Sequence, residues 1–549
     1  MRSLLEKAKL VEKELLSMCG FILLNNLSIG GQFNHFSDAV HDLTHRGPDD
    51  KQMLATQGKY AYYFYRLSIM DPSIKGRQPF KLNHKHLMCN GEIYNFKALR
   101  QFLRTQGYSF AGNSDCEVLI PLFEVVGIEV MVKMLDAEFA FVLVDEEQDK
   151  LFAARDPFGI RPMFYGYTYQ TNQICFASEA KGLMKCCHSI KPFPPGHYYA
   201  DGIFKQYHDV GEVSFMIEAS LETITTQIRQ KLETAVIKRL EADAPIGYLL
   251  SGGLDSSLVC AIAAHASDVP IQTFAIGMEH DPIDLKYAKD VSKALGTDHT
   301  EVLMSKADVL GALRDVIYHL ETWDITTIRA SIGMYLVAKY IHEHTDLKVL
   351  LTGEVSDELF GYKYTDFAPD AASFQKEAAK RVREIHMYDV LRADRTLAAH
   401  SLEARVPFAD LDFASYVMSI NPAHKRNTYG KGKYLLRKAF EKTDLLPTHI
   451  LLREKAAFSD AVGHSMVDYL KEYAEETYSD EAFVEGIKKY PEQTPFTKES
   501  LLYREIFEEF YPGYSSWVKD FWMPNKAWIG DDINDPSARV LSNYGESGK

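Results

Sequence analysis

The segment from Ile246 to Ser257, IGYLLSGGLDSS, passes from an apolar run through paired glycines into hydroxyl residues that open a second apolar run. This order predicts a β-strand, an anion-binding loop and a helix that begins near Leu258. Gly252 and Gly253 have no Cβ, so their backbone N–H groups can approach a phosphate closely. The helix would point the positive end of its dipole at the same place. An ordinary Gly/Ser turn before a helix is the alternative for a shorter string of this kind.

Asp255 is unexpected in an anion site, because a bare carboxylate repels phosphate. A magnesium ion between the two groups would resolve this conflict. The hydroxyls of Ser251, Ser256 and Ser257 add further donors. The full SGGxDSS string resembles the pyrophosphate loop of enzymes that split ATP into AMP and pyrophosphate, and it differs from the GxxxxGK[ST] loop of kinases and GTPases. We therefore expect ATP as a substrate and Mg²⁺ as its metal.

Length, charge and cysteine content limit the remaining possibilities. The chain has 549 residues, 46% of them apolar, which exceeds what one core usually spans and predicts two domains. Its formal charge of −15, without a basic block, argues against nucleic acid as a partner. No apolar run reaches the ~18 residues that cross a bilayer, and the charged N-terminus does not fit a secretory signal. Seven cysteines without a CxxC pattern suggest neither a disulfide framework nor a zinc site. We expect a cytoplasmic protein that binds small molecules but neither nucleic acid nor membranes. If the protein forms an assembly, we expect a homodimer.

The two halves of the chain have different sequence patterns. Up to about residue 205, short apolar runs alternate with turn residues, as in a strand-rich domain. From about residue 221, helical spacing dominates and short strands stand between long helices, which predicts a parallel sheet covered by helices. We divide the chain into an N-terminal extension (1–18), a first domain (19–208) and a second domain (209–549) whose polar tail is expected to be poorly ordered.

Cys19 is the first residue outside the loop that suggests chemistry. A lone cysteine is usually a small packing residue. The motifs around it change this interpretation, and in chain order they read HRGPD (45–49), YRLSI (65–69), CNGEIYN (89–95), GNSDCE (112–117) and RDPFGIRP (155–162). From residue 18 to about residue 200, this order resembles the glutaminase domain of class II glutamine amidotransferases.

The resemblance implies an N-terminal-nucleophile fold, an αββα sandwich in which Cys19 is the first residue of the mature chain. Its free α-amine, with a pKa near ~7.7 to 8, would accept the thiol proton. Cys19 would then attack the side-chain amide of glutamine. The Asn90 side chain and the Gly91 backbone N–H would form the oxyanion hole, where one donor is worth on the order of 3 kcal/mol.

The same resemblance implies three residues that bind glutamine. Arg66 would hold the α-carboxylate in a bidentate fork, and Asp115, with Glu92 nearby, would receive the α-ammonium group. Each of the two acidic residues could instead cap a turn or a helix.

Residues 1–18 precede Cys19 and would block its α-amine. Translation could start at Met18, the segment could be a cleaved leader, or it could remain and leave the glutaminase inactive. We expect the start at Met18, because a small residue such as cysteine permits removal of the initiator methionine.

A second ordered set of motifs accompanies the SGGLDSS loop. It comprises DPIDLKYA (281–288), ETWDITTIRAS (321–331), LTGEVSDELFG (351–361), HSLEARVPF (400–408), REK (453–455) and FSD (458–460). Together they resemble the synthetase domain of the glutamine-dependent asparagine synthetase family, and the likeness extends to YREIF (503–507) and DPS (535–537). This implies an α/β ATP-pyrophosphatase domain of the adenine nucleotide α-hydrolase type.

The resemblance also implies an ATP site. Its residues would be Leu250, Ile276, Thr352 and Gly353 around the adenosine part, and Ser251, Gly252, Gly253, Asp255, Ser256 and Ser257 in the phosphate loop. Asp255 and Asp357 would coordinate Mg²⁺, and Lys455 would neutralise the departing pyrophosphate. Taken singly, Asp357 and Lys455 could be surface ion pairs.

The reaction implied is the amidation of aspartate by an ATP-dependent carbon–nitrogen ligase. A carboxylate accepts ammonia poorly, so ATP would convert it to β-aspartyl-AMP. Ammonia made at Cys19 would then attack this adenylate, giving asparagine, glutamate, AMP and pyrophosphate. Arg329 would pair with aspartate near Thr326 and Thr327, although an arginine taken singly would be interpreted as part of a surface ion pair. Glu354 would handle the proton of ammonia.

Four positions depart from the family pattern, one of them Tyr362, which follows Gly361 where the family has a second glycine. Val355 fills the third position of the usual GEG[SA]DE string, and a β-branched residue tolerates φ > 0 poorly. Ala456 replaces an acidic residue, and Ala461 stands where glycine is usual. Two alternatives therefore stay open: amidation of another small carboxylic acid, and a non-catalytic sensor of nucleotide or glutamine that retains the fold.

Overall fold

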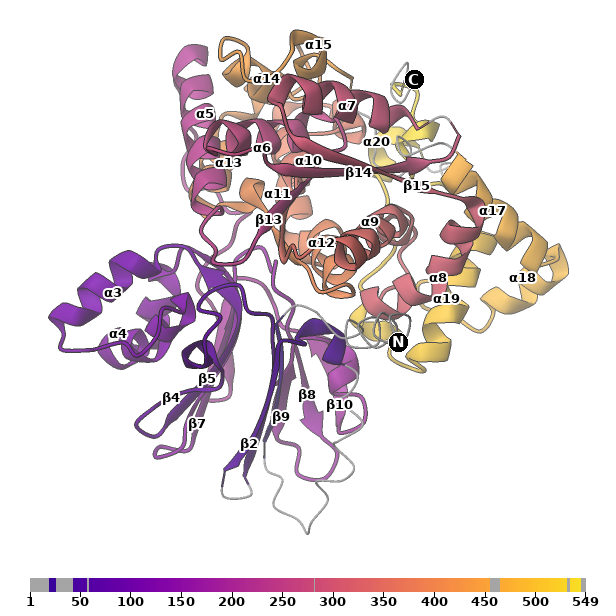
Figure 1. The fold of residues 1–549 in the computed structure, drawn as a ribbon. Coiled ribbons are helices and arrows are strands. Elements are labelled where there is room, and N and C mark those ends of the chain that lie inside the picture. The colour runs from indigo at the N-terminus through magenta and orange to yellow at the C-terminus, as the bar shows by residue number, and fades with distance from the viewer. Residues whose placement is uncertain are drawn as a thin grey trace, which may run out of the picture. The chain divides into compact units, whose positions relative to one another are not determined.

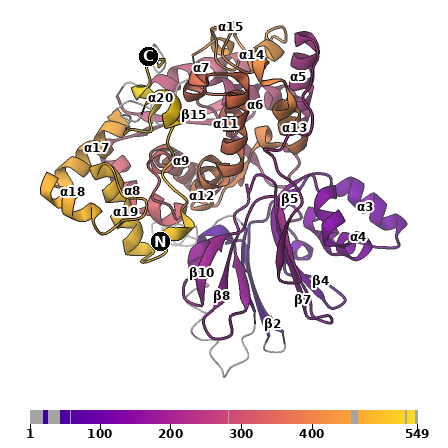
Figure 2. The same ribbon diagram turned by 180° about the vertical axis from the view of Figure 1, so that it is seen from behind.

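The computed structural model describes residues 19–25, 43–56, 59–280, 282–454, 465–530 and 534–544. The chain forms two compact units, coloured by position along the chain in Figure 1 and seen from behind in Figure 2. Unit 1 takes the chain up to Asp209, with residues 242–245 and 397–403, and unit 2 takes the rest. No helix within the described ranges is both long enough and apolar enough to cross a membrane.

Unit 1 contains two six-stranded antiparallel sheets. The first has the order β10 (Cys187–Pro192), β8 (Phe164–Thr168), β9 (Ile174–Ala177), β1 (Gly20–Asn25), β3 (Tyr60–Arg66) and β2 (Asp50–Thr56). The second has the order β12 (Ile203–Gln206), β11 (His197–Ala200), β7 (Lys150–Arg155), β6 (Ala137–Asp145), β5 (Lys85–Ile93) and β4 (Phe80–Leu82). The strand-rich pattern of the sequence thus corresponds to two sheets within one unit.

Alternation along β5 shows how the layers of unit 1 pack. Met88 belongs to the apolar core that also contains Phe21 of β1, so it faces the first sheet. Its neighbour Leu87 points the other way and packs with Leu103 of α3 (Phe96–Thr105) and Leu122 of α4 (Leu119–Met134). The two stacked sheets, with α3 and α4 over the second one, are layers of the expected αββα sandwich.

Unit 2 is built on a five-stranded sheet with the order β15 (Asp298–Met304), β14 (Gln272–Met278), β13 (Ile246–Leu249), β16 (Val349–Leu351) and β17 (Glu403–Arg405). The first four strands pair in parallel. Between them run α6 (Leu254–His265), α7 (Ile283–Leu295), α8 (Lys306–Leu320) and α9 (Ile325–His344). Figure 1 shows α6 and α7 on one face of this sheet and α9 on the other, which is the helix-covered parallel sheet that the sequence predicts.

Unit 2 has further helices within the described residues. They are α5 (Leu221–Lys238), α10 (Ser356–Phe360), α11 (Ala371–Glu384), α12 (Asp389–Ala398), α13 (Leu411–Ser419), α14 (Tyr434–Phe440), α15 (Thr448–Leu451), α17 (Ser465–Thr477), α18 (Asp480–Ile487), α19 (Lys498–Phe510) and α20 (Lys526–Ile529). Among them, α10, α12, α17 and α19 carry charged side chains that matter for the site described below, and Lys433 directly precedes α14.

Asp324 fixes the start of α9. Its carboxylate accepts hydrogen bonds from the backbone N–H of Thr327 (2.8 Å) and from the backbone N–H of Trp522 (2.6 Å). The side chain is fully buried, and burial raises the pKa of Asp324 to about 6. This cap therefore positions the first turn of α9, and its cost is the burial of a carboxylate away from water.

We predict that Asp324 makes folding stability fall as the pH rises from about 4 to about 6. Because its folded pKa lies above the ordinary value, the folded protein binds more protons than the unfolded chain in that window. Asp324→Asn cannot titrate, so its free energy of unfolding relative to the wild type should rise across the window by on the order of 2 kcal/mol. Urea denaturation at several pH values measures this difference.

Asp370→Asn is the matched control, because Asp370 caps α11 by accepting a hydrogen bond from Ser373 N (2.7 Å) at the surface. That bond lowers the pKa of Asp370, so the relative stability of this variant should fall as the pH rises. Equal pH slopes for the two variants would contradict the assignment of a raised pKa to Asp324.

Candidate functional site

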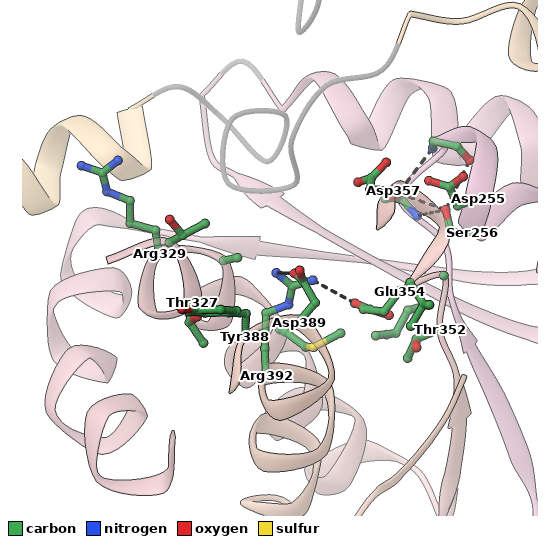
Figure 3. Close-up of a pocket in the computed structure, with 18 of the residues that line it drawn as sticks. Asp255, Ser256, Thr327, Arg329, Thr352, Glu354, Asp357, Tyr388, Asp389 and Arg392 are labelled. Atoms are coloured by element: carbon green, nitrogen blue, oxygen red, sulfur yellow. Dashed lines mark hydrogen bonds and ion pairs between the residues drawn. The ribbon is translucent and has the colours of Figure 1, made fainter. Parts of the chain in front are cut away.

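A pocket in unit 2 lies where the parallel strands end. Its lining includes Leu250 after β13, Ile276 of β14 and Thr352 after β16. From β13 the chain proceeds to β14 and β15 on one side, whereas β16 lies on the other side of β13. This is a topological switch point, the usual ligand position in an open α/β sheet. Figure 3 shows the pocket with labelled side chains.

The structure brings most of the predicted ATP residues together in this pocket. Those that line it are Leu250, Ser251, Gly253, Asp255, Ser256, Ile276, Thr352 and Gly353. Gly252 and Ser257 do not line it. Gly252 has φ +69°, and a Cβ there would lie 2.4 Å from the Ala288 backbone nitrogen, so its role is close approach to α7. Ser257 is fully buried inside α6.

The loop between β13 and α6 is held by its own serines. The hydroxyls of Ser251 and Ser256 lie 3.0 Å apart, and the Gly253 backbone N–H donates to the Ser251 hydroxyl (3.3 Å). Because α6 begins at Leu254, the N-terminal end of this helix and its unpaired N–H groups adjoin the pocket. This geometry suits a phosphate, which is what the SGGLDSS string predicts.

Asp255 and Asp357, the two predicted metal ligands, meet at one cation of the protein. The Lys433 ammonium group donates to both carboxylate oxygens of Asp255 (2.9 Å each) and lies 2.5 Å from Asp357. Ser356 adds a hydrogen bond to Asp255 (2.8 Å). Lys433 lies before α14, 178 residues from Asp255 along the chain, and the sequence analysis did not identify it.

The donor set at Asp255 and Asp357 fits magnesium. The two carboxylates share a single ammonium group, so their remaining negative charge makes a further cation at this place electrostatically favourable. Among the residues that the structure describes, no cluster of three or more His, Cys, Asp or Glu side chains could hold a metal alone. Magnesium in phosphate sites typically uses one or two carboxylates and takes its other ligands from phosphate and water.

Glu354 is held by an arginine that the sequence analysis also missed. Arg392 of α12 donates to one carboxylate oxygen of Glu354 (3.2 Å) and pairs with Asp389 (2.8 Å). The other oxygen of Glu354 is buried and has no hydrogen-bond partner within the described part of the chain. Figure 3 shows Arg392 reaching from its helix to Glu354 across the pocket. The unpaired oxygen is therefore available to a ligand with N–H groups.

Arg329 lies on α9, on the opposite side of the pocket from Asp255 and Asp357 (Figure 3). Its guanidinium group forms two hydrogen bonds with Glu499 of α19, at 2.8 and 2.5 Å. A third hydrogen bond joins it to Asp535 (3.0 Å). The predicted acceptor-binding arginine thus lines the pocket, but carboxylates of the chain itself occupy it.

Val355 adopts the left-handed backbone conformation, which is unfavourable for a β-branched residue. Its backbone has φ +79° and ψ −20°, and its side chain is almost completely buried against the pocket. A β-branched residue in this region stores strain on the order of 1–3 kcal/mol. The strain lies directly between Glu354 and the start of α10.

We predict that Val355→Gly changes stability little, because two effects oppose each other. Glycine adopts φ > 0 freely and relieves the strain, whereas loss of the buried isopropyl group costs about 1.5–3 kcal/mol. The net change in the free energy of unfolding should stay below about 1 kcal/mol. Val349→Gly in β16 is the control, since Val349 is equally buried in extended backbone and carries no such strain. A larger drop in the calorimetric unfolding midpoint is expected for Val349→Gly, and equal drops would contradict the strain at Val355.

Unit 1 places Cys19 at the edge of the core between its two sheets. The Leu67 backbone N–H donates to the Cys19 sulfur (3.3 Å), and the thiol lies 3.4 Å from the Leu67 carbonyl oxygen. Burial raises the pKa of the Cys19 thiol to about 12, and the charges of Arg66 and Glu92 also act on it. The thiol is therefore protonated near neutral pH and needs a base before it can attack an amide.

Asn90, the predicted oxyanion-hole residue, is fully buried in β5. Within the described residues, both its side-chain nitrogen and its side-chain oxygen lack a hydrogen-bond partner. A buried amide without partners is costly unless a ligand satisfies it. Gly91 follows it in the strand, and a Cβ there would lie 2.3 Å from the Glu138 carbonyl oxygen, so this position requires glycine.

The predicted glutamine-binding residues are buried and anchored. Arg66 donates to the backbone carbonyls of Ser73 (2.9 Å) and Asp71, and Gly76 leaves room for its guanidinium group. Asp115 accepts a hydrogen bond from the Ile93 backbone N–H (2.7 Å), so part of its carboxylate serves the fold. Met18, Lys455, Ala456 and Ala461 lie outside the described residues.

Known proteins match both units of the chain. A glutamine amidotransferase domain family model matches residues 18–203, and an asparagine synthase family model matches residues 227–376 and 367–530. The chain is 41% identical to the glutamine-hydrolysing asparagine synthetase of Cricetulus griseus, over 92% of this chain and 96% of that protein. It is also 41% identical to the same enzyme of Homo sapiens (91% and 95%) and of Gallus gallus (91% and 95%).

Proposed function

The chain belongs to the glutamine-hydrolysing asparagine synthetase family, and on that premise we propose how its own residues carry out the reaction. It is an ATP-dependent ligase with a class II glutamine amidotransferase domain and an ATP-pyrophosphatase domain. It forms asparagine from aspartate, with glutamine as the nitrogen donor. We place the domain boundary between residues 208 and 209 and the enzyme in the cytoplasm. The observation that carries the residue assignments is the single pocket that joins the SGGLDSS loop, two carboxylates and Arg329.

In the first half-reaction, Cys19 attacks the side-chain amide of glutamine. The α-amine of Cys19 accepts the thiol proton, which the raised pKa makes necessary at neutral pH. The unpaired amide of Asn90 and the Gly91 backbone N–H receive the oxyanion. Arg66 holds the α-carboxylate of glutamine, while Asp115 and Glu92 hold its ammonium group.

In the second half-reaction, ATP lies across the carboxyl ends of β13, β14 and β16, with its phosphates at the SGGLDSS loop. Asp255 and Asp357 would hold Mg²⁺, which supplies charge neutralisation for the leaving pyrophosphate. Lys433, beside these carboxylates, and Lys455 provide additional positive charge. Arg329 binds the acceptor aspartate at the other side of the pocket.

Glu354 acts when ammonia attacks the adenylate. One of its oxygens is fixed by Arg392 and the other is unpaired in the pocket. The free oxygen can accept a hydrogen bond from ammonia and then take up the proton that the nitrogen loses as the amide forms. Arg392 thereby keeps Glu354 in one orientation. Amidation of another small carboxylic acid is the second candidate function, because Val355 changes the lining next to Glu354.

We predict that the two sites can be inactivated separately. Cys19→Ala should abolish glutamine-dependent synthesis but leave synthesis from ammonium salt, which should increase at alkaline pH where free ammonia is abundant. Asp255→Asn should abolish pyrophosphate release with either nitrogen source, while glutamine hydrolysis continues. Asparagine and pyrophosphate are measured in parallel and should form in equal amounts. Pyrophosphate release with another acid but not with aspartate would favour the second candidate function, and no release with any acid would favour a sensor.

We also predict that glutamine hydrolysis requires a free Cys19 amine. Protein that starts at Cys19 should release glutamate from glutamine, whereas protein with a verified, uncleaved Met1 should behave like Cys19→Ala. Ammonium-dependent synthesis should be the same for both proteins and serves as the control for folding. Equal glutaminase rates would show that a group other than the α-amine deprotonates the thiol.

A further inference from the structure

The last described segment of the chain crosses the adenylation pocket. This C-terminal strap, residues 534–544, contributes Pro536, Ser537 and Ala538 to the pocket lining. Its far end is fixed by Lys363, whose ammonium group donates to the carbonyl of Asn543 (3.2 Å), and by an apolar cluster that includes Leu541. The strap contains only one short 3-10 helix, Ala538–Val540. It is thus attached to unit 2 mainly by side-chain contacts.

The near end of the strap is bound to Arg329. Asp535 accepts a hydrogen bond from Nη1 of Arg329 (3.0 Å), and the Ser537 hydroxyl accepts another from the same nitrogen (2.7 Å). Glu499 takes Nε and Nη2. A guanidinium group has five N–H donors, so only one, on Nη2, is left among the described contacts. An incoming carboxylate can therefore bind Arg329 in a bidentate manner only if one of these contacts, such as that of Asp535 on Nη1, gives up its donor.

The charge balance leads to the same conclusion. Arg329 and Lys471 together face two carboxylates, Glu499 and Asp535, so the charges of this cluster are balanced. A third carboxylate would give the cluster a net negative charge in a largely buried place, which is unfavourable. Replacement of Asp535 by the acceptor keeps the count of charges around Arg329 unchanged. Lys471 of α17 already pairs with the second oxygen of Asp535 and is partly exposed, so it can retain this side chain after displacement.

We propose that Asp535 is an internal competitor for the acceptor carboxylate: the strap occupies Arg329 in the empty enzyme, and aspartate binds by displacing it. Asp535 is then a specificity-determining residue, because only an acid that replaces its carboxylate on Arg329 opens the strap. This inference rests on the proposed function, which assigns the acceptor site to Arg329.

The test compares Asp535→Asn with the wild type in ammonium-dependent synthesis, measured as the rate of pyrophosphate release. The neutral amide keeps the shape of the side chain but binds the guanidinium group more weakly, so the strap competes less. The KM for aspartate should fall by a factor of about 5 or more, while kcat and the KM for ATP stay close to the wild-type values. An unchanged or raised KM for aspartate would overturn the proposal.

Asp468→Asn is the matched control. Asp468 of α17 pairs with Arg539 of the strap at 3.5 Å and does not touch Arg329. Asp468→Asn removes one contact between a surface carboxylate and the strap, so the KM for aspartate should not change. A fall in KM equal to that of Asp535→Asn would show that general loosening of the strap, rather than competition at Arg329, is responsible, and would overturn the proposal.

Hydrogen exchange on the wild-type enzyme gives a second measurement that does not depend on a variant. Added aspartate should increase amide exchange in residues 534–538 and leave α17 unchanged; no increase would overturn the proposal.

The proposed function can fail independently of the strap proposal: if the wild type releases no pyrophosphate with aspartate and ammonium, the acceptor assignment itself is wrong. Pyrophosphate release without a lower KM in Asp535→Asn would reject the strap proposal alone.

Discussion

Pairing of buried carboxylates with cations is the constraint on which the unit 2 pocket depends. Three cations each hold two carboxylates: Lys433 with Asp255 and Asp357, Arg392 with Glu354 and Asp389, and Arg329 with Glu499 and Asp535. The clusters at Lys433 and Arg392 have one more negative than positive charge, whereas Lys471 also pairs with Asp535 and balances the cluster at Arg329. Buried charges of this kind are tolerated only when they are paired, so the clusters hold α6, α9, α10, α12, α19 and the start of α14 in fixed positions around the pocket.

The charges of these clusters suit the chemistry in three different ways. At Lys433 the excess of negative charge favours a divalent cation, which ATP requires in order to approach two carboxylates. At Arg392 it leaves one carboxylate oxygen of Glu354 for a nitrogen nucleophile. At Arg329 the charges are already balanced, so an acidic acceptor must replace a carboxylate rather than join it. Unit 1 works by the opposite principle, because burial keeps the Cys19 thiol neutral until its proton is removed.

Local sequence predicted those parts of the site that lie within one short motif. The SGGLDSS string gave the strand, the loop and the helix, because its glycines and hydroxyls act within a few residues of one another. The strain at Val355 could likewise be predicted, because a β-branched residue at a position where the family has glycine tolerates φ > 0 poorly. Lys433 and Arg392 were not predicted, because 178 residues separate Lys433 from Asp255 and 38 separate Arg392 from Glu354. An isolated Lys or Arg in a helical pattern carries no sign of its partner, and only the fold brings the two together.

Arg329 shows why a residue can be predicted correctly as part of a site and still be misunderstood. Sequence likeness placed it opposite the acceptor, and the pocket lining includes it. What likeness could not show is that Asp535, 206 residues further along the chain, already occupies it. An ion pair and a substrate contact are therefore not exclusive interpretations of one arginine. The ion pair sets the free energy that a substrate must exceed, and a buried arginine whose charge is already balanced by carboxylates admits an acid by such an exchange.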